Sequence, residues 1–224
     1  PPRSTLFPYT TLFRSIYSRL AADLQNKSLV LATVVKTEGS TPQKPGSSAV
    51  FSEKGLLYGT VGGGVVEGRV QAAASEALRS KKSEYFTYDL SNDISNKEEA
   101  ICGGKITVLI DANPSVSIVA FGKLLDSIEQ CVPGVLVTMV RTSAEESVMI
   151  NRYWMSGNVV PDLPSEFMEK ILPVVQQQIK GRNSYDFREM TLSFPDDRQD
   201  SQLLIEPVFP DRKSTRLNSS HVSQ

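Results

Sequence analysis

The sequence predicts a mixed α+β protein that consists of two small units. Continuous apolar runs and alternating runs are typical of strands, and stretches with helical periodicity lie between them. A glycine-rich turn leads one strand directly into a helix, which identifies an N-terminal unit at residues 16–113. The pattern changes after Pro114, and a second α+β unit is expected at residues 114–210.

The first unit is expected to begin with a helix, because Ile16, Leu20 and Leu24 recur at helical spacing over residues 16–25. The other expected elements follow in chain order: strands at 29–35, 48–51 and 56–61, a helix at 65–78, and strands at 84–89 and 105–111.

The second unit shows the same two kinds of pattern. It predicts a helix at 118–130, strands at 135–141 and 147–155, a helix after Pro164, and strands at 185–192 and 202–209. The segments VLIDANP and LLIEP resemble each other faintly; we prefer chance to an internal repeat as the explanation.

Both ends of the chain resemble translated sequencing adapters. The first fifteen residues, PPRSTLFPYTTLFRS, contain Leu-Phe-Arg-Ser, which is the translation of the adapter segment CTCTTCCGATCT, and DRKSTRLNSSH near the other end matches the partner adapter in the same way. We therefore expect residues 1–15 and 211–224 to be non-native tails that pack poorly, and residues 16–210 to be the natural fragment.

The charge and the histidine content exclude some classes of function. The tails hold five of the 24 Lys and Arg and one of the 25 Asp and Glu, which leaves 19 basic against 24 acidic residues and a net charge of −5. An acidic chain without a basic stripe argues against nucleic-acid binding. The one histidine, His221, lies in a tail, so mechanisms that need imidazole are not expected.

Cysteine usage and hydropathy predict the compartment. Cys102 and Cys131 form no CxxC motif, which suits a reducing cytoplasm better than a disulfide scaffold. No apolar run approaches the roughly 20 residues that span a bilayer. A cytoplasmic protein without a membrane segment is expected.

The strongest local signal is GLLYGTVGGGVVEGRV, a strand that leads through Gly62, Gly63 and Gly64 into a helix. Glycines permit positive φ angles, and the N–H groups of such a turn and of the first helical turn form an anion site. The Walker A pattern is not met because no Lys-Ser/Thr follows the glycines, and the dinucleotide fingerprint is not met because Glu67 stands at the third glycine position. A phosphate site and a purely structural turn both remain open. Glu67 would either favour the helix dipole or accept two ring N–H groups from a guanine-like ligand edge.

The second signal is the loop EGSTPQKPG, in which Pro42 and Pro45 restrict the backbone. It is either a ligand-binding loop or a proline-braced surface turn. Lys44 is the cation of this loop that could meet a phosphate. The polar groups that it offers are Glu38, Ser40, Thr41, Gln43 and Lys44.

The third signal is Cys102, followed by Gly103 and Gly104. A thiol beside two glycines is open to close approach and suits persulfide or soft-metal chemistry; an inert core thiol is the alternative. Cys131 follows an apolar helix and is expected to be structural.

The segments ATVVKTEGSTPQKPG, GTVGGGVVEGRV and AICGGKITVLIDA, in this order, resemble the XdhC/CoxI family of accessory proteins over residues 29–112. The resemblance implies a cytoplasmic bacterial chaperone without substrate turnover of its own. Such a protein binds the molybdenum cofactor (molybdopterin) as cargo, protects it while a cysteine desulfurase adds sulfur, and delivers it to an apo molybdenum hydroxylase. A homo-oligomer is expected.

The resemblance also implies the residues that hold the cofactor, with Cys102 as the metal contact. They are Glu38, Ser40, Thr41, Lys44, Gly62, Gly63, Gly64, Glu67, Cys102, Gly103 and Gly104. Val65 and Gln43 depart from the family pattern, in which many relatives have a cysteine and a basic residue. The family also predicts a Rossmann-type domain after residue 210, which this chain does not contain.

Two other functions remain as alternatives. One is a thiol-dependent oxidoreductase that uses Cys102 on a small substrate. The other is a scaffold that binds the hydroxylase or the desulfurase without touching the cofactor.

Overall fold

The structure is a computed structural model, and it confirms the mixed α+β class. It describes residues 9–90, 103–142, 147–157, 161, 163, 165–181, 187–193 and 200–210, with side chains from residue 16 onward.

The first sheet contains five antiparallel strands whose order in space differs from their order in the chain. They are β1 (Val30–Glu38), β2 (Ser48–Ser52), β3 (Gly55–Gly59), β4 (Glu84–Asp89) and β5 (Lys105–Asp111). The spatial order is β3-β2-β1-β5-β4. β1 therefore lies at the centre, and its end at Glu38 pairs with the start of β5 at Lys105.

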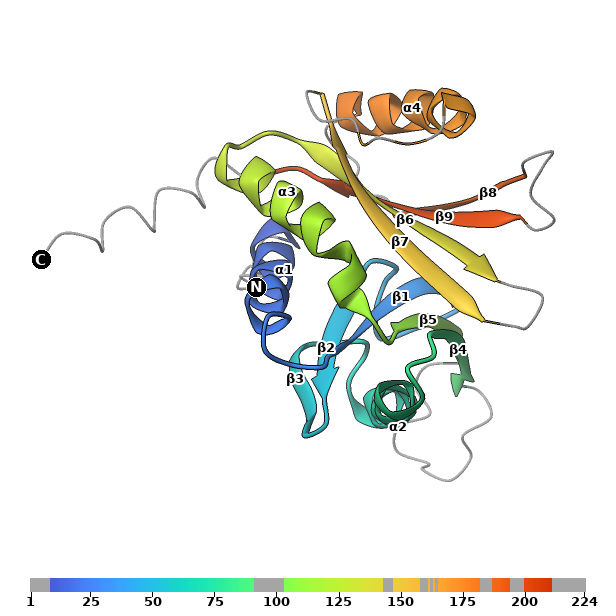
Figure 1. Ribbon diagram of the computed structural model, residues 1–224. Helices are drawn as coiled ribbons and strands as arrows, with labels where there is room; N and C mark the ends of the chain where they lie inside the picture. Colours follow the sequence, from blue (N-terminus) through green and yellow to red (C-terminus); the bar gives the residue numbers. More distant parts are fainter. Residues whose placement is uncertain are drawn as a thin grey trace, which may run out of the picture.

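Helix α2 (Gly64–Ser80) covers the outer face of this sheet (Figure 1). Val66, Val70, Ala74 and Ala77 recur at three- and four-residue spacing and are buried against the strands. The helix extends one residue before and two residues beyond the predicted range of 65–78, and β3 ends at Gly59 because Thr60 already belongs to the turn.

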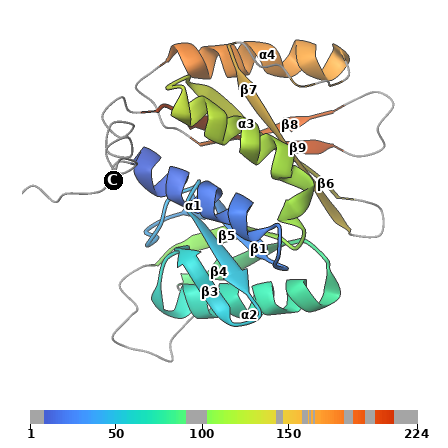
Figure 2. The same cartoon turned by 60° about the vertical axis from the view of Figure 1, so that its left-hand side comes forward.

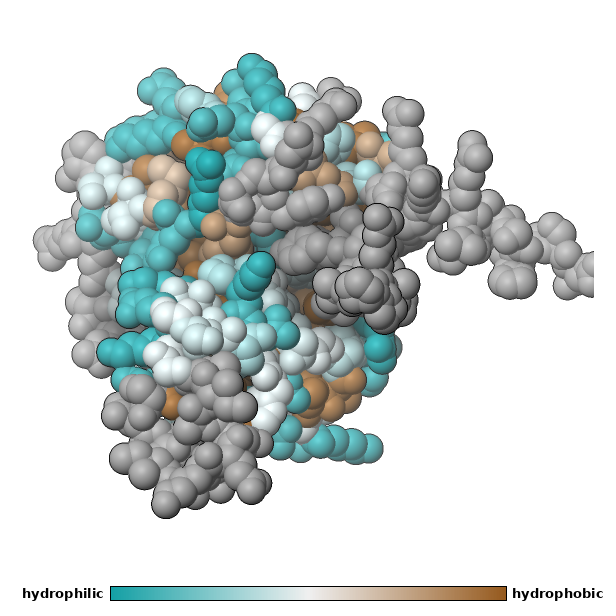
Figure 3. All heavy atoms as spheres, turned by 180° about the vertical axis from the view of Figure 1, so that it is seen from behind, coloured by the Kyte–Doolittle hydropathy of each residue, from teal (hydrophilic) through white to brown (hydrophobic). Residues whose placement is uncertain are grey.

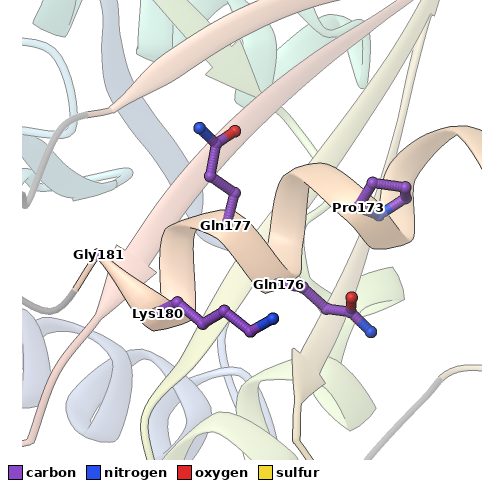
Figure 4. A pocket seen from close by; sticks show the side chains of 5 residues that line it. All are labelled: Pro173, Gln176, Gln177, Lys180 and Gly181. Carbon is purple, nitrogen blue, oxygen red and sulfur yellow. The ribbon is translucent and has the colours of Figure 1, made fainter.

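The second sheet contains four antiparallel strands in the order β7-β6-β9-β8. They are β6 (Gly134–Thr142), β7 (Val148–Ser156), β8 (Arg188–Leu192) and β9 (Ser201–Val208). Helix α4 (Ser165–Lys180) covers its outer face and buries Phe167, Ile171 and Val175 there. A shallow hollow near the end of α4 is lined by Pro173, Gln176, Gln177, Lys180 and Gly181, whose polar side chains project in different directions (Figure 4).

Two helices lie between the sheets, so the molecule has five layers (Figure 2). They are α1 (Tyr9–Asp23) and α3 (Ile118–Glu129), and α3 follows the short 3-10 helix η2 (Pro114–Ser117). Leu20 of α1 and Phe121 of α3 belong to one core with Leu31 of the first sheet and Trp154 of the second. α1 begins at Tyr9, seven residues before the predicted start. The prediction began at Ile16, the first apolar residue of the pattern, and apolar spacing does not mark where a helical backbone begins.

A buried polar cluster joins the two sheets. Arg152 of β7 donates to the Asp111 carboxylate at the end of β5, and its guanidinium carbon lies 5.7 Å from the centre of the Phe121 ring. Tyr17 of α1 donates to Glu206 of β9 at 3.4 Å. Burial, followed by the Glu206 charge, raises the pKa of the Tyr17 hydroxyl well above its usual range. The cluster therefore helps to fix how the two sheets are oriented.

The surface seen in Figure 3 is mainly hydrophilic, with apolar residues in small separate areas. Within the described residues, no helix is long and apolar enough to cross a membrane.

Candidate functional site

The sheet topology brings the three sequence motifs together. The EGSTP loop follows β1, the CGG motif precedes β5, and the glycine turn connects β3 to α2. Because Glu38 pairs with Lys105 in the antiparallel β1–β5 ladder, the loop after β1 starts beside the residues before β5.

Gly104 lies directly beneath the EGSTP loop. A Cβ atom on Gly104 would overlap the carbonyl oxygens of Glu38 and Ser40 and would lie 2.9 Å from Cγ2 of Thr41. Gly39 packs from the other side, since a Cβ there would lie 3.1 Å from the Gly103 carbonyl oxygen. Only glycine permits this approach of two backbones.

Pro42 connects the loop to the glycine turn. A Cβ atom on Gly62 would lie 2.9 Å from Cγ of Pro42, so the two segments are in contact. The order in space is thus Gly103 and Gly104, the EGSTP loop and the glycine turn. These segments adjoin one another, and we call residues 38–46, 62–64 and 103–104 the motif surface.

The glycine turn has the backbone conformation that the sequence predicted. The φ angles of Gly62, Gly63 and Gly64 are 141°, 68° and 50°. Gly63 is the N-cap of α2, and within the described residues no side chain caps this helix end. A Cβ on Gly63 would meet no described atom within 4 Å, so the backbone at the start of the 17-residue helix is open to approach.

Thr60 and Glu67 hold the turn in place. The Thr60 hydroxyl donates to Oε2 of Glu67 at 3.0 Å and accepts from the Gly62 N–H at 3.2 Å. The Glu67 carboxylate therefore lies over the turn that precedes its own helix. This arrangement agrees with the structural interpretation of Glu67 and leaves its second oxygen, Oε1, as a further acceptor.

The other predicted loop residues divide into internal contacts and exposed groups. The Thr41 hydroxyl donates to the Gln43 carbonyl at 2.9 Å, which braces the loop. Glu38 is exposed and pairs with Lys36 at 2.9 Å. The hydrogen bond from Lys36 and then its charge lower the pKa of the Glu38 carboxyl and correspondingly raise that of Lys36. Ser40 and Lys44 are exposed.

The cysteines have different outcomes. Cys102 lies outside the described residues, so its role stays a prediction. Cys131 is half-buried just after α3 and has a φ of 56°, and its expected structural role stays a prediction. Among the described residues, no group of three or more His, Cys, Asp and Glu is arranged to hold a metal.

Sequence reasoning missed two residues that position the motif surface. Thr60 received no role, although a hydroxyl two residues before a glycine turn is a recognisable turn signal. Pro42 was interpreted as a brace of its own loop, and its contact with Gly62 depends on the fold.

The fold and the motif surface define a class of protein: a two-sheet α+β protein with glycine-rich loops gathered at the end of its first sheet. Residues 23–89 match the XdhC and CoxI family. An uncharacterized protein, YqeB, of Escherichia coli (strain K12) is 28% identical over 109 residues, which are 47% of this chain and 20% of YqeB. A probable xanthine dehydrogenase subunit of Bacillus subtilis (strain 168) is 35% identical over 98 residues, 43% of this chain and 29% of that protein.

A crystal structure of a xanthine dehydrogenase from Bacillus halodurans has the same fold, with a TM-score of 0.57 at 18% sequence identity. The match covers 87% of this chain and 53% of that one. Within the first sheet and its helix, residues 23–89 are thus similar to the XdhC and CoxI family. The matched segments span less than a third of both curated relatives.

Proposed function

We propose that this protein is an accessory protein for a xanthine-dehydrogenase-type molybdenum hydroxylase, and that it binds the molybdenum cofactor on the motif surface. The protein would hold the cofactor as cargo in the cytoplasm, receive sulfur for it from a cysteine desulfurase, and release it to the apo hydroxylase. The similarity of residues 23–89 to the XdhC and CoxI family supports the accessory role. The observation that supports cofactor binding is that Gly103 and Gly104, the EGSTP loop and the glycine turn adjoin one another at the uncapped start of α2.

The start of α2 is suited to the phosphate of a pterin cofactor. The N–H groups of the first helical turn carry a partial positive charge, and the open backbone at Gly63 gives a phosphate room to reach them. Glu67 lies within the same turn, and Oε1 of its carboxylate is an acceptor for pterin ring N–H groups.

Cys102 is proposed as the soft contact to molybdenum or its sulfur. It precedes Gly103, which lies beside the EGSTP loop, and thiolate ligands suit soft metals. In a paired titration, Cys102→Ser should weaken binding of the molybdenum form far more than binding of the metal-free pterin precursor. If Cys102→Ser binds the molybdenum form as tightly as the parent does, the thiol does not contribute to binding, and the cofactor would be held by the glycine turn and the EGSTP loop alone.

The glycine turn is tested by Gly63→Val, which puts a branched side chain where the cofactor phosphate is expected. Gly55→Val is the matched control, since Gly55 also has a positive φ, of 97°, but lies at the far end of β3. We expect Gly63→Val to lose molybdopterin binding, measured by pterin fluorescence after equilibrium dialysis, and Gly55→Val to keep it. Equal binding by both variants would favour the scaffold alternative, in which the turn is structural.

A further inference from the structure

A second polar cleft lies at the opposite end of α2 from the motif surface. Its volume is about 240 Å³, and it is bounded by the α1–β1 connection, the residue after α2, and the β5–η2 connection. At 1.5 Å per residue, the 17 residues of α2 separate it from the glycine turn by about 25 Å. The cleft is thus distinct from the proposed cofactor site.

The cleft has two cations that come from separate elements. Lys27 follows α1 and Lys81 follows α2, and both line the cleft. Lys27 pairs with Asp23 at 2.7 Å, so the three groups together carry one net positive charge. Hydrogen-bond donors accompany them: the hydroxyl of Ser28 and the amide of Asn113.

The Asn113 side chain is oriented by its neighbour. The Ser115 hydroxyl donates to Oδ1 of Asn113 at 2.6 Å, which assigns the amide oxygen to Ser115 and leaves the two N–H donors of the same amide on its other side. The Asn113 backbone N–H is occupied by Asp111 at 2.9 Å, which fixes this corner of the cleft.

Lys81 holds a backbone conformation that does not favour lysine. Its φ is 57° and its ψ is 25°, in the left-handed region where a helix usually ends with glycine. A substitution by glycine would relieve this strain and would remove the ammonium group at the same time. Binding and stability are then predicted to change in opposite directions.

We propose that this cleft binds a small oxyanion, such as phosphate or a short carboxylate, between Lys27 and Lys81. The volume is below the roughly 300 to 1,000 Å³ of pockets that hold drug-sized ligands, which favours a small anion over a nucleotide. The hollow at the end of α4 differs in having a single cation, Lys180, and no convergence of its polar side chains.

The test is a titration of the whole chain with inorganic phosphate against chloride at equal ionic strength, followed by thermal unfolding. Phosphate should raise the melting temperature of the parent more than chloride does at the same ionic strength. Lys81→Gly should lower the phosphate affinity about tenfold, the loss expected for one charge-assisted hydrogen bond. Its melting temperature in chloride should equal or exceed that of the parent.

Two controls separate this cleft from other sources of the effect. Lys82→Ala removes the neighbouring exposed charge, which does not line the cleft, and should keep the phosphate response. Gly63→Val blocks the phosphate position proposed at the glycine turn, at the other end of α2, so the phosphate response that remains in this variant should come from the cleft and should be lost when Lys81→Gly is added. The proposal is overturned if the parent shows no response to phosphate beyond that to chloride, if Gly63→Val retains no phosphate response at all, or if Lys81→Gly added to Gly63→Val leaves the remaining response unchanged.

Discussion

The buried polar cluster between the two sheets, which we call the joint, differs from the motif surface in how its polar groups are satisfied. In the joint, the Arg152 and Asp111 side chains are each 3% exposed and are paired with one another. On the motif surface, the backbone at the start of α2 is open to approach at Gly63, and Gly64 is exposed. The buried pair therefore helps to hold the two sheets together, whereas the motif surface has unused hydrogen-bonding capacity for a ligand.

The joint should be the more sensitive of the two regions. Arg152→Met keeps the length of the side chain but leaves the Asp111 carboxylate buried without its cation, which costs about 3 to 5 kcal/mol of unfolding free energy. Denaturant unfolding measures this loss. Arg79→Met is the control, because Arg79 pairs with Glu76 on the exposed face of α2 and its loss should cost under about 0.5 kcal/mol. A loss for Arg152→Met as small as that of the control would contradict a structural role for the joint.

The contact between the CGG motif and the EGSTP loop is tested by two neighbouring glycines. Gly104→Ala forces a Cβ into the carbonyl oxygens of Glu38 and Ser40, and we expect a loss of about 1 to 3 kcal/mol. Gly103→Ala adds the same methyl group where no described atom lies within 4 Å. Its free energy of unfolding should therefore change by less than about 0.5 kcal/mol. Equal losses for the two variants would show that the loop does not pack on Gly104.

The smallest effect is expected at the Thr60 hydroxyl. Thr60→Val keeps the shape of the side chain but removes the hydroxyl that links the Gly62 N–H to Glu67, at a cost of about 1 kcal/mol. Thr87→Val, which breaks an exposed Thr87–Thr107 hydrogen bond in the same sheet, serves as the comparison. If unfolding experiments give the same change for both, the Thr60 bridge contributes no more than an exposed surface contact.

The glycine turn of the motif surface was easier to predict from the sequence than the Arg152–Asp111 pair of the joint, for physical reasons. The glycine turn depends on local backbone chemistry, so Gly62, Gly63 and Gly64 were recognisable from their spacing before a helix. The joint depends on strands from both sheets. Asp111 and Arg152 are 41 residues apart, and nothing in the local pattern marks them as partners.

Helix ends show the same limit. The apolar spacing of Ile16, Leu20 and Leu24 predicted the buried face of α1, but it gave no indication of the start at Tyr9. Similarly, the helix and strands of the second unit were predictable from their periodicity, while the position of α3 between the two sheets was not.

The central claim is that the cofactor binds where the three motifs meet. Hydrogen–deuterium exchange of the backbone amides, with and without molybdopterin, tests it most directly. Bound molybdopterin should slow exchange at residues 62–66 and 39–47 and leave exchange at residues 113–116, beside the distant cleft, unchanged. Protection confined to residues outside the motif surface, or no protection at saturating cofactor, would contradict it.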